Sequence, residues 1–106
     1  MITSVAGLRP GCSSIAYAVS KAALNHLTAL LAKSFGPVRV NAVAPGLVDT
    51  PLSASLVDVR ATVAETVPLH RSGRPHDCAE AVLALLRNAY LTGQVLVVDG
   101  GHTLVW

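Results

Sequence analysis

The hydrophobic positions in two stretches of the chain recur every three or four residues, which is typical of helices. In residues 15–34, the apolar side chains of Leu24, Leu27 and Leu31 share one face of a predicted helix. Serines before this stretch can cap its first turn, and a Phe-Gly-Pro sequence ends the pattern. Residues 75–89 have the same period and begin with a proline, which fits the first turn of a helix.

Other stretches lack helical spacing and are rich in β-branched or consecutive apolar residues. Residues 38–44 lie between two prolines and predict a strand. Residues 94–101 begin with a nearly unbroken apolar run, which predicts a strand buried on both faces. The first seven residues predict a strand stub followed by a loop. Residues 46–73 have no clear period and predict a long loop, with a short helix within 56–66.

The predicted order is strand stub, helix, strand, long loop, helix, strand. Strands that alternate with helices are typical of β-α-β crossovers and a parallel sheet, so the predicted fold class is α/β. Two strands and a stub leave apolar strand edges unpaired. We therefore expect the end of a larger sheet.

The composition indicates that part of the surface is apolar and covered by other protein. The chain has 106 residues, of which 52% are hydrophobic and 13% are charged, whereas soluble domains have about 25% charged residues. We therefore expect apolar surface to meet another protein or a missing part of the same fold. The net charge of +2 comes from scattered residues, which argues against a nucleic-acid partner. Lys21, His26 and Lys33 interrupt the longest apolar helical stretch, and no signal peptide is recognisable, so we expect a cytoplasmic protein with no membrane span.

Several other residues are expected to have no catalytic or metal-binding role. Cys12 and Cys78 lie far apart and are expected to be buried free thiols. The four histidines lack companions at ligand spacing, so we expect no metal site. Asn41 in the second strand and Asp99 after the last one are expected to have structural roles. Trp106 is expected to be an exposed anchor or a subunit contact.

One pair of residues suggests acid–base chemistry. Tyr17 and Lys21 are one helical turn apart, so their Cβ atoms lie about 5–6 Å apart. A fixed cation beside a phenol lowers its pKa and makes it a usable acid or base. Taken alone, the pair is better explained as a surface tyrosine beside a solvated lysine. Ser4 strengthens the chemical interpretation, because it follows the strand stub and its hydroxyl could face the same cleft.

Five short sequence motifs, taken together and in this order, are much more specific than any one of them. These blocks are "ITSVAG", "YAVSKAAL", "VRVNAVAPGLVDTP", "PLHRSGRPHDCAEAV" and "YLTGQVLVVDGG". With them, the chain resembles the C-terminal half of a short-chain dehydrogenase/reductase. The resemblance implies one partial domain, residues 1–106, with the C-terminal part of a Rossmann-like, doubly wound parallel sheet.

The resemblance also implies roles for single residues. Ser4 corresponds to the serine that hydrogen-bonds the substrate oxygen, and Tyr17 to the general acid/base. Lys21 corresponds to the lysine that lowers the pKa of that tyrosine and binds the nicotinamide ribose, and Tyr17 is expected to contact the cofactor as well. The family interconverts a small-molecule alcohol and a carbonyl with NAD or NADP, and its members are commonly homo-oligomers.

Further cofactor contacts are implied after the second predicted strand. Pro45 and Gly46 match the turn beside the nicotinamide. Val48, through its backbone, and Thr50 match positions that contact the carboxamide. Residues 51–72 correspond to the loop that covers the substrate.

The sequence departs from the family pattern in one important respect. The glycine-rich loop that binds the pyrophosphate is absent from these 106 residues, as are the family's Asn-Asn-Ala-Gly motif and the residue that selects NAD or NADP. His70 stands where relatives commonly carry glycine. We therefore expect a fragment of a reductase that is inactive or nearly so alone. The alternative is a non-catalytic interaction or oligomerisation module derived from such an enzyme.

Overall fold

The computed structural model describes residues 1–11 and 13–105, so the expectations for Cys12 and Trp106 lie outside the described residues. The elements are, in chain order, η1 (Val5–Gly7), α1 (Ile15–Ser34), β1 (Ala42–Pro45), η2 (Pro51–Ser53), α2 (Val57–Thr66), α3 (Pro75–Arg87), β2 (Val95–Val98) and α4 (His102–Val105). The predicted long helix, the short helix and the later helix are confirmed as α1, α2 and α3. The short α4 was not predicted.

The strands form a parallel sheet. β1 and β2 pair in parallel, with Ala42 opposite Val95. On the other edge of β1, Ile2 forms an isolated parallel bridge with Val43. The Thr3 N–H donates to the Val43 carbonyl at 2.8 Å. The predicted strand stub is therefore a single bridge, and the order across the sheet is stub, β1, β2.

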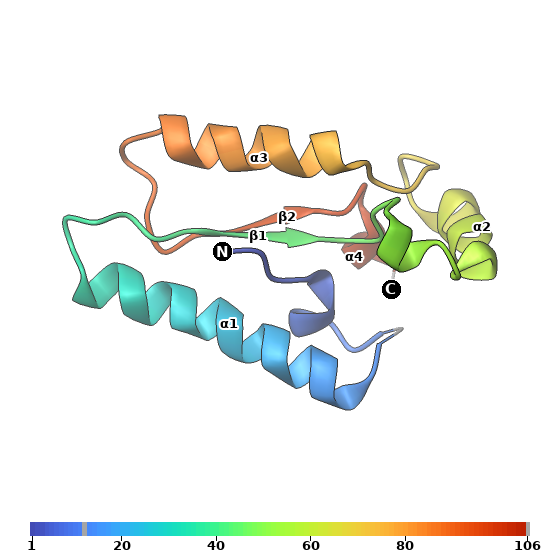
Figure 1. Cartoon of the computed structure of the whole chain (residues 1–106), viewed down its shortest axis with the longest axis horizontal. Helices are drawn as coiled ribbons and strands as arrows, with labels where there is room; N and C mark the ends of the chain where they lie inside the picture. The colour runs from blue at the N-terminus through green and yellow to red at the C-terminus, as the bar shows by residue number, and fades with distance from the viewer. Residues whose placement is uncertain (12, 106) are drawn as a thin grey trace.

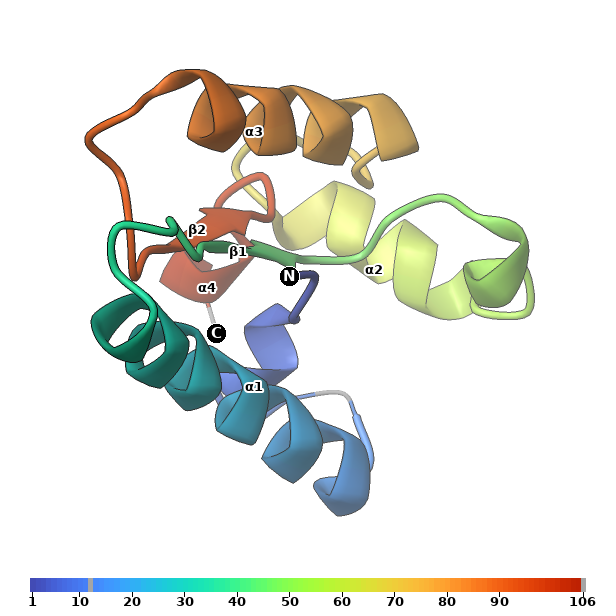
Figure 2. The same cartoon turned by 60° about the vertical axis from the view of Figure 1, so that its left-hand side comes forward.

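Helices lie on both sides of this sheet. In both views the strands run between α1 on one side and α3 on the other (Figures 1 and 2). α3 packs against both β1 and β2. The core is centred on β1, where Val43 is only 1% exposed. This arrangement confirms the α/β class with a doubly wound, parallel sheet.

The prediction that the last strand is buried on both faces is wrong for the described chain. Leu96 and Val97 point to opposite faces of β2, yet they are 39% and 37% exposed. β2 lies at the edge of the sheet, and the described helices cover its faces only in part.

The strand predicted over residues 38–44 begins later, at Ala42. The Arg39 side chain leaves the sheet and donates to the carbonyls of Leu85 and Leu86, at 2.8 and 2.9 Å. These carbonyls belong to the last turn of α3, where a cation offsets the negative end of the helix dipole. Arg39 therefore caps α3 in place of extending β1.

Asn41 has the structural role that was expected. Its amide nitrogen donates to the Leu91 carbonyl at 2.9 Å, and its amide oxygen accepts from the Gln94 N–H at 3.0 Å. Asp99 also has its expected role, because its carboxylate accepts the N–H groups of Gly101 and Thr103. Burial raises the pKa of Asp99, but these N–H groups, together with the Thr103 side chain and His102, outweigh it and leave the pKa below its ordinary value.

The buried face of α1 differs from the predicted leucine face. Thr28 and Ala32 are buried, whereas Leu27 is 41% exposed. The Thr28 hydroxyl is satisfied inside the helix, because it donates to the Leu24 carbonyl at 2.9 Å. Small side chains at these positions let the helix approach the rest of the chain closely.

Cys78 is a free thiol, as expected, but it is half-buried rather than buried. Burial raises the pKa of this thiol, and the neighbouring Asp77 carboxylate adds to the effect. His70 adopts a φ of 50° in the left-handed region, which is uncommon for residues other than glycine. Within the described residues, no helix is both long enough and apolar enough to cross a membrane.

An ion pair fixes the start of α3. The Arg71 guanidinium donates to both carboxylate oxygens of Asp77, at 2.7 and 3.0 Å. Asp77 also accepts the Arg74 N–H at 2.6 Å, as in a capping box. The Arg71 hydrogen bond is the largest cause that holds the pKa of Asp77 well below its ordinary value, and the Arg74 N–H adds to it.

We expect Asp77→Asn to flatten the loss of stability in acid. A carboxyl group whose pKa is depressed by folding stabilises the fold above its unfolded pKa of about 4, and this contribution is lost as pH falls below that value. Melting temperatures measured from pH 6 to pH 2 should fall more steeply for the unmodified chain than for Asp77→Asn. The difference should be small and sensitive to salt, because the pair is exposed. Parallel curves would contradict the prediction.

Candidate active site

Tyr17 and Lys21 lie side by side on α1, in the first two turns. The Ser14 hydroxyl caps this helix by accepting the Tyr17 N–H at 3.3 Å. The Lys21 ammonium lies 5.4 Å from the centre of the Tyr17 ring. It also donates to the Ile2 carbonyl at 3.2 Å. The cation is therefore held between the ring and the strand stub, while Tyr17 as a whole is 46% exposed.

Ser4 follows the strand stub directly and is the N-cap of η1. Its hydroxyl oxygen accepts the Ala6 N–H at 3.2 Å. No acceptor for its own hydrogen is found among the described residues, so this hydrogen remains available.

Gly7 brings the Ser4 loop into direct contact with the helix that carries Tyr17 and Lys21. A Cβ atom at Gly7 would lie 2.5 Å from the Lys21 carbonyl carbon. The Asn25 amide donates to the Gly7 carbonyl at 3.2 Å and ties η1 to α1. The sequence analysis missed Asn25. Its position four residues after Lys21 was the available signal, because that spacing puts it on the same helix face.

A second group of predicted residues follows β1. The Gly46 N–H donates to the Val98 carbonyl at 3.0 Å. A Cβ at Gly46 would lie 2.8 Å from the Asp99 Cβ, so the ends of the two strands meet without intervening side-chain bulk. Val48 forms an isolated parallel bridge with Gly73. Its own N–H has no acceptor among the described residues.

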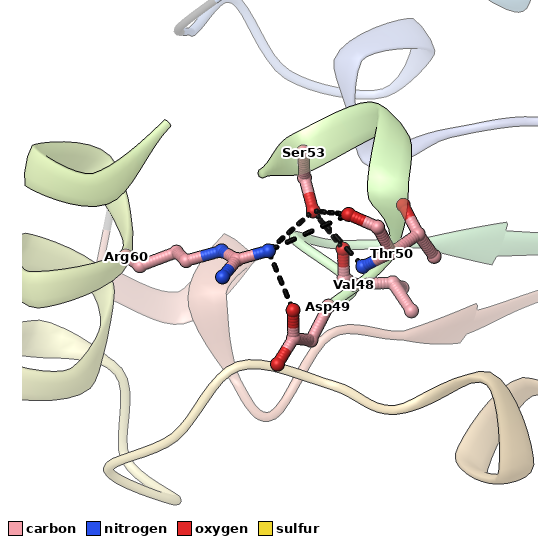
Figure 3. A network of polar contacts seen from close by, with 5 residues as sticks. All are labelled: Val48, Asp49, Thr50, Ser53 and Arg60. Carbon is pink, nitrogen blue, oxygen red and sulfur yellow. Dashed lines mark hydrogen bonds and ion pairs between the residues drawn. The ribbon is translucent and has the colours of Figure 1, made fainter. Parts of the chain in front are cut away.

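Residues 48–50 are held by a network that sequence analysis did not find (Figure 3). Ser53 in η2 and Arg60 in α2 converge on this segment, and Arg60 also pairs with Asp49. No sequence signal indicated these contacts, because residues 46–73 have no clear period.

The two groups share one edge of the sheet. The stub and β1 run in parallel, so Ser4 and Gly46 both follow the carboxyl ends of their strands. Ligands bind at that edge in open α/β sheets. No hydrogen bond or ion pair joins the two groups within the described chain. Pro45 pairs with Val98 at the end of β1, and Thr50 is the N-cap of η2.

A cavity of about 310 Å³ lies away from these residues, between α3 and the strands, with Ile2, Arg39 and Leu85 in its lining. None of the predicted site residues lines it. Among the described residues, no three His, Cys, Asp or Glu side chains gather in a way that could hold a metal ion.

The family model described as enoyl-(acyl carrier protein) reductase matches residues 1–103. The chain belongs to the short-chain dehydrogenase/reductase family. This family consists of NAD(P)-dependent oxidoreductases with a Rossmann-like fold, which agrees with the parallel sheet and its flanking helices. The resemblance recognised from the five sequence blocks is therefore confirmed.

Curated relatives from distant organisms match nearly the whole chain. A Streptomyces violaceoruber protein named as ketoacyl reductase 2 of the granaticin polyketide synthase is 53% identical and matches 98% of the chain, which spans 43% of it. Carbonyl reductase family member 4 of Danio rerio is 43% identical and matches 98% of the chain, which spans 44% of it. The chain thus spans less than half the length of these relatives.

Solved structures agree with this assignment. A small-chain dehydrogenase in complex with NADPH superposes with a TM-score of 0.91 and 30% identity, over 97% of this chain and 49% of that one. A Brucella melitensis 3-oxoacyl-[acyl-carrier protein] reductase with bound NAD has a TM-score of 0.85 and 35% identity, over 94% of this chain and 38% of that one.

Proposed function

We propose that Ser4, Tyr17 and Lys21 form the catalytic part of an NAD(P)-dependent reductase that interconverts an alcohol and a carbonyl. The observation that carries the proposal is the position of the Lys21 ammonium, 5.4 Å from the Tyr17 ring and bound to the Ile2 carbonyl. An ammonium held beside a phenol favours the negative charge that the phenol carries after it gives up its proton.

Each side chain then has a distinct task during reduction. The free hydrogen of the Ser4 hydroxyl donates to the substrate carbonyl oxygen and orients it. Tyr17 gives its proton to that oxygen as the alcohol forms, and takes it back in the oxidative direction. Lys21 stabilises the phenolate that remains. Gly7 and Asn25 hold the Ser4 loop against α1, so that the three groups keep their relative positions.

The residues after β1 fit a nicotinamide cofactor. Such a cofactor supplies the hydride in this reaction. The unpaired Val48 N–H is a suitable donor to its carboxamide, and Pro45, Gly46 and Thr50 would border the ring. The close approach of Gly46 to Asp99 supports this, because it keeps the strand ends free of side-chain bulk. Lys21 would also bind the ribose hydroxyls.

We further propose that the substrate is a 3-oxoacyl group. The names of the relatives include ketoacyl and 3-oxoacyl reductases. The segment expected to cover the substrate presents exposed apolar side chains, with Leu52, Leu56 and Val57 at 93%, 42% and 66% exposure. An acyl chain would cover such side chains and remove their apolar surface from water.

The direct test uses the natural polypeptide that contains these residues. Its oxidation of NADH and NADPH is followed by absorbance with a 3-oxoacyl thioester and with a short ketone. We expect turnover with the thioester and at least one cofactor. The isolated 106-residue chain should turn over slowly or not at all, because it lacks a glycine-rich pyrophosphate loop. Failure of the natural polypeptide to bind or oxidise either cofactor would refute the proposal.

Apolar surface on α1 and β2 supports self-association. Leu30 and Phe35 are 49% and 57% exposed, and Leu96 and Val97 on the edge strand are also exposed. We expect the natural polypeptide to form a homo-oligomer, which light scattering would detect. The same surface favours the second candidate, a non-catalytic module. A stable complex formed without any turnover or cofactor binding would support that candidate.

A further inference from the structure

We propose that Arg60 is a positioning residue that couples the docking of α2 to the shape of the nicotinamide-binding residues 48–50. α2 lies within the segment expected to cover the substrate. Arg60 would therefore link closure over the substrate to cofactor affinity. The inference rests on the proposed function, because it assumes that Val48 and Thr50 meet the cofactor.

Arg60 reaches from α2 to three groups near the end of β1 (Figure 3). Its Nη2 atom lies 2.5 Å from the Asp49 carboxylate and 3.1 Å from the Ser53 hydroxyl. A longer contact of 3.5 Å joins the same atom to the Thr50 carbonyl. The Arg60 side chain is only 28% exposed, so these contacts are partly shielded from water.

The Ser53 hydroxyl transmits the position of Arg60 to the backbone. A hydroxyl has two acceptor sites and one hydrogen. Ser53, which is 7% exposed, accepts the Thr50 N–H at 3.1 Å and the Arg60 guanidinium N–H. Its single hydrogen has two carbonyls within reach, Val48 at 2.7 Å and Thr50 at 3.1 Å, and the shorter distance favours Val48. Arg60 strengthens that preference, because its guanidinium also lies 3.5 Å from the Thr50 carbonyl and competes for it.

That hydrogen bond fixes the peptide group between Val48 and Asp49. The Val48 carbonyl at one end is bound by Ser53, and the Asp49 N–H at the other end donates to the Gly73 carbonyl at 2.8 Å. The Val48 N–H, which has no partner in the described chain, belongs to the preceding peptide group, whose Leu47 carbonyl accepts the Gly73 N–H at 2.8 Å. Gly73 therefore holds the peptide group before Val48, and Ser53 and Gly73 together hold the one after it. Loss of Arg60 would free the Ser53 hydrogen to turn toward the Thr50 carbonyl, which lies 3.1 Å away.

The experiment compares Arg60→Met, Arg60→Lys and a control in the natural polypeptide. Glu65→Gln is the matched control, because Glu65 is an exposed, charged residue of α2 whose side chain makes no polar contact with the described residues. Hydrogen–deuterium exchange is measured for residues 47–53 and 57–66, and the Kd of NADH and NADPH is measured directly. Arg60→Met should increase exchange in both segments and raise the cofactor Kd about tenfold, which is within the usual range of coupling between sites.

The kinetic pattern separates coupling from simple stability. The KM for cofactor should rise about as much as the Kd, while kcat at saturating cofactor changes by less than about threefold. Arg60→Lys should restore part of the affinity, because it keeps a cation and N–H donors on a side chain one atom shorter. Glu65→Gln should leave exchange and affinity unchanged.

Three outcomes would overturn the inference. One is faster exchange in α2 with residues 47–53 unaffected, and another is an unchanged cofactor Kd. If Arg60→Met does not fold, Asp49→Asn replaces it and should raise the cofactor Kd by a smaller factor. The third outcome is an unchanged cofactor Kd in Asp49→Asn. If the unmodified polypeptide binds no cofactor, the proposed function is refuted. Hydrogen–deuterium exchange of residues 47–53 in the Arg60 variants still decides whether Arg60 holds that segment.

Discussion

Replacement of Tyr17 by phenylalanine is expected to lower kcat/KM for carbonyl reduction by about 10²- to 10⁴-fold, the usual contribution of a general acid–base group. The substitution removes the hydroxyl that supplies the proton and keeps the ring that lies 5.4 Å from the Lys21 ammonium. Tyr17 is 46% exposed, so the fold should tolerate the change. Steady-state kinetics of the natural polypeptide with saturating cofactor would measure the loss.

The chain offers a matched control for this substitution. Tyr90 is 98% exposed and follows α3 in the loop before β2, so Tyr90→Phe makes the same chemical change away from the site. It should keep full activity. Cofactor affinity should fall far less than kcat/KM in Tyr17→Phe, because the lost hydroxyl acts mainly on the substrate oxygen and the ring is retained. Retention of more than a tenth of the activity by Tyr17→Phe would exclude it as the proton donor.

Replacement of Gly7 by alanine is expected to destabilise the fold by about 1–3 kcal/mol, the usual cost of overpacking. The added Cβ would lie 2.5 Å from the Lys21 carbonyl carbon and 2.6 Å from the Ala22 nitrogen. Both atoms belong to the backbone of α1 and cannot move aside as a side chain would. The Ser4 loop must therefore withdraw from the helix, which would separate Ser4 from Tyr17 and Lys21.

Urea unfolding measures the first effect, and kcat measures the second. Gly36→Ala is the control, because a Cβ at Gly36 meets nothing within 4 Å. It should leave stability and kcat nearly unchanged. Equal stability of the two alanine variants would contradict the close contact between η1 and α1.

The Gly7 contact and the Arg60 network are expected to affect different kinetic constants. Gly7 and Asn25 hold the groups that act on the substrate oxygen, while Arg60 and Ser53 hold the segment proposed to meet the cofactor. Since no polar contact joins the two groups within the described residues, each can be tested separately. Substitutions at Gly7 should lower kcat, whereas substitutions at Arg60 should raise the KM for cofactor.

Local patterns predicted the helices well, because helices form from contacts between near neighbours. The period over residues 15–34 predicted α1 with its bounds, and the proline at position 75 predicted the start of α3. The strands were predicted less well. Arg39 caps α3 through contacts 46 and 47 residues away, and this shortens the strand expected over residues 38–44.

Burial was the weakest prediction, because it depends on what covers each face. The apolar run of β2 predicted a strand buried on both faces, but Leu96 and Val97 are 39% and 37% exposed. β2 forms one edge of the sheet, and the chain spans only 43% of the length of its Streptomyces relative. An apolar run indicates that a strand favours burial, and only the neighbouring elements decide whether it is buried.

The sequence by itself determined the three longer helices, the α/β class, the family and the pair of Tyr17 and Lys21. These depend on short spacings and ordered blocks that are readable along the chain. The tertiary structure alone decided how the pair is held by Ile2, Gly7 and Asn25, and how Arg60 and Ser53 hold residues 48–50. Such contacts depend on the path of the backbone and the close approach of separate segments. That path results from packing of the whole chain, and no local pattern encodes it.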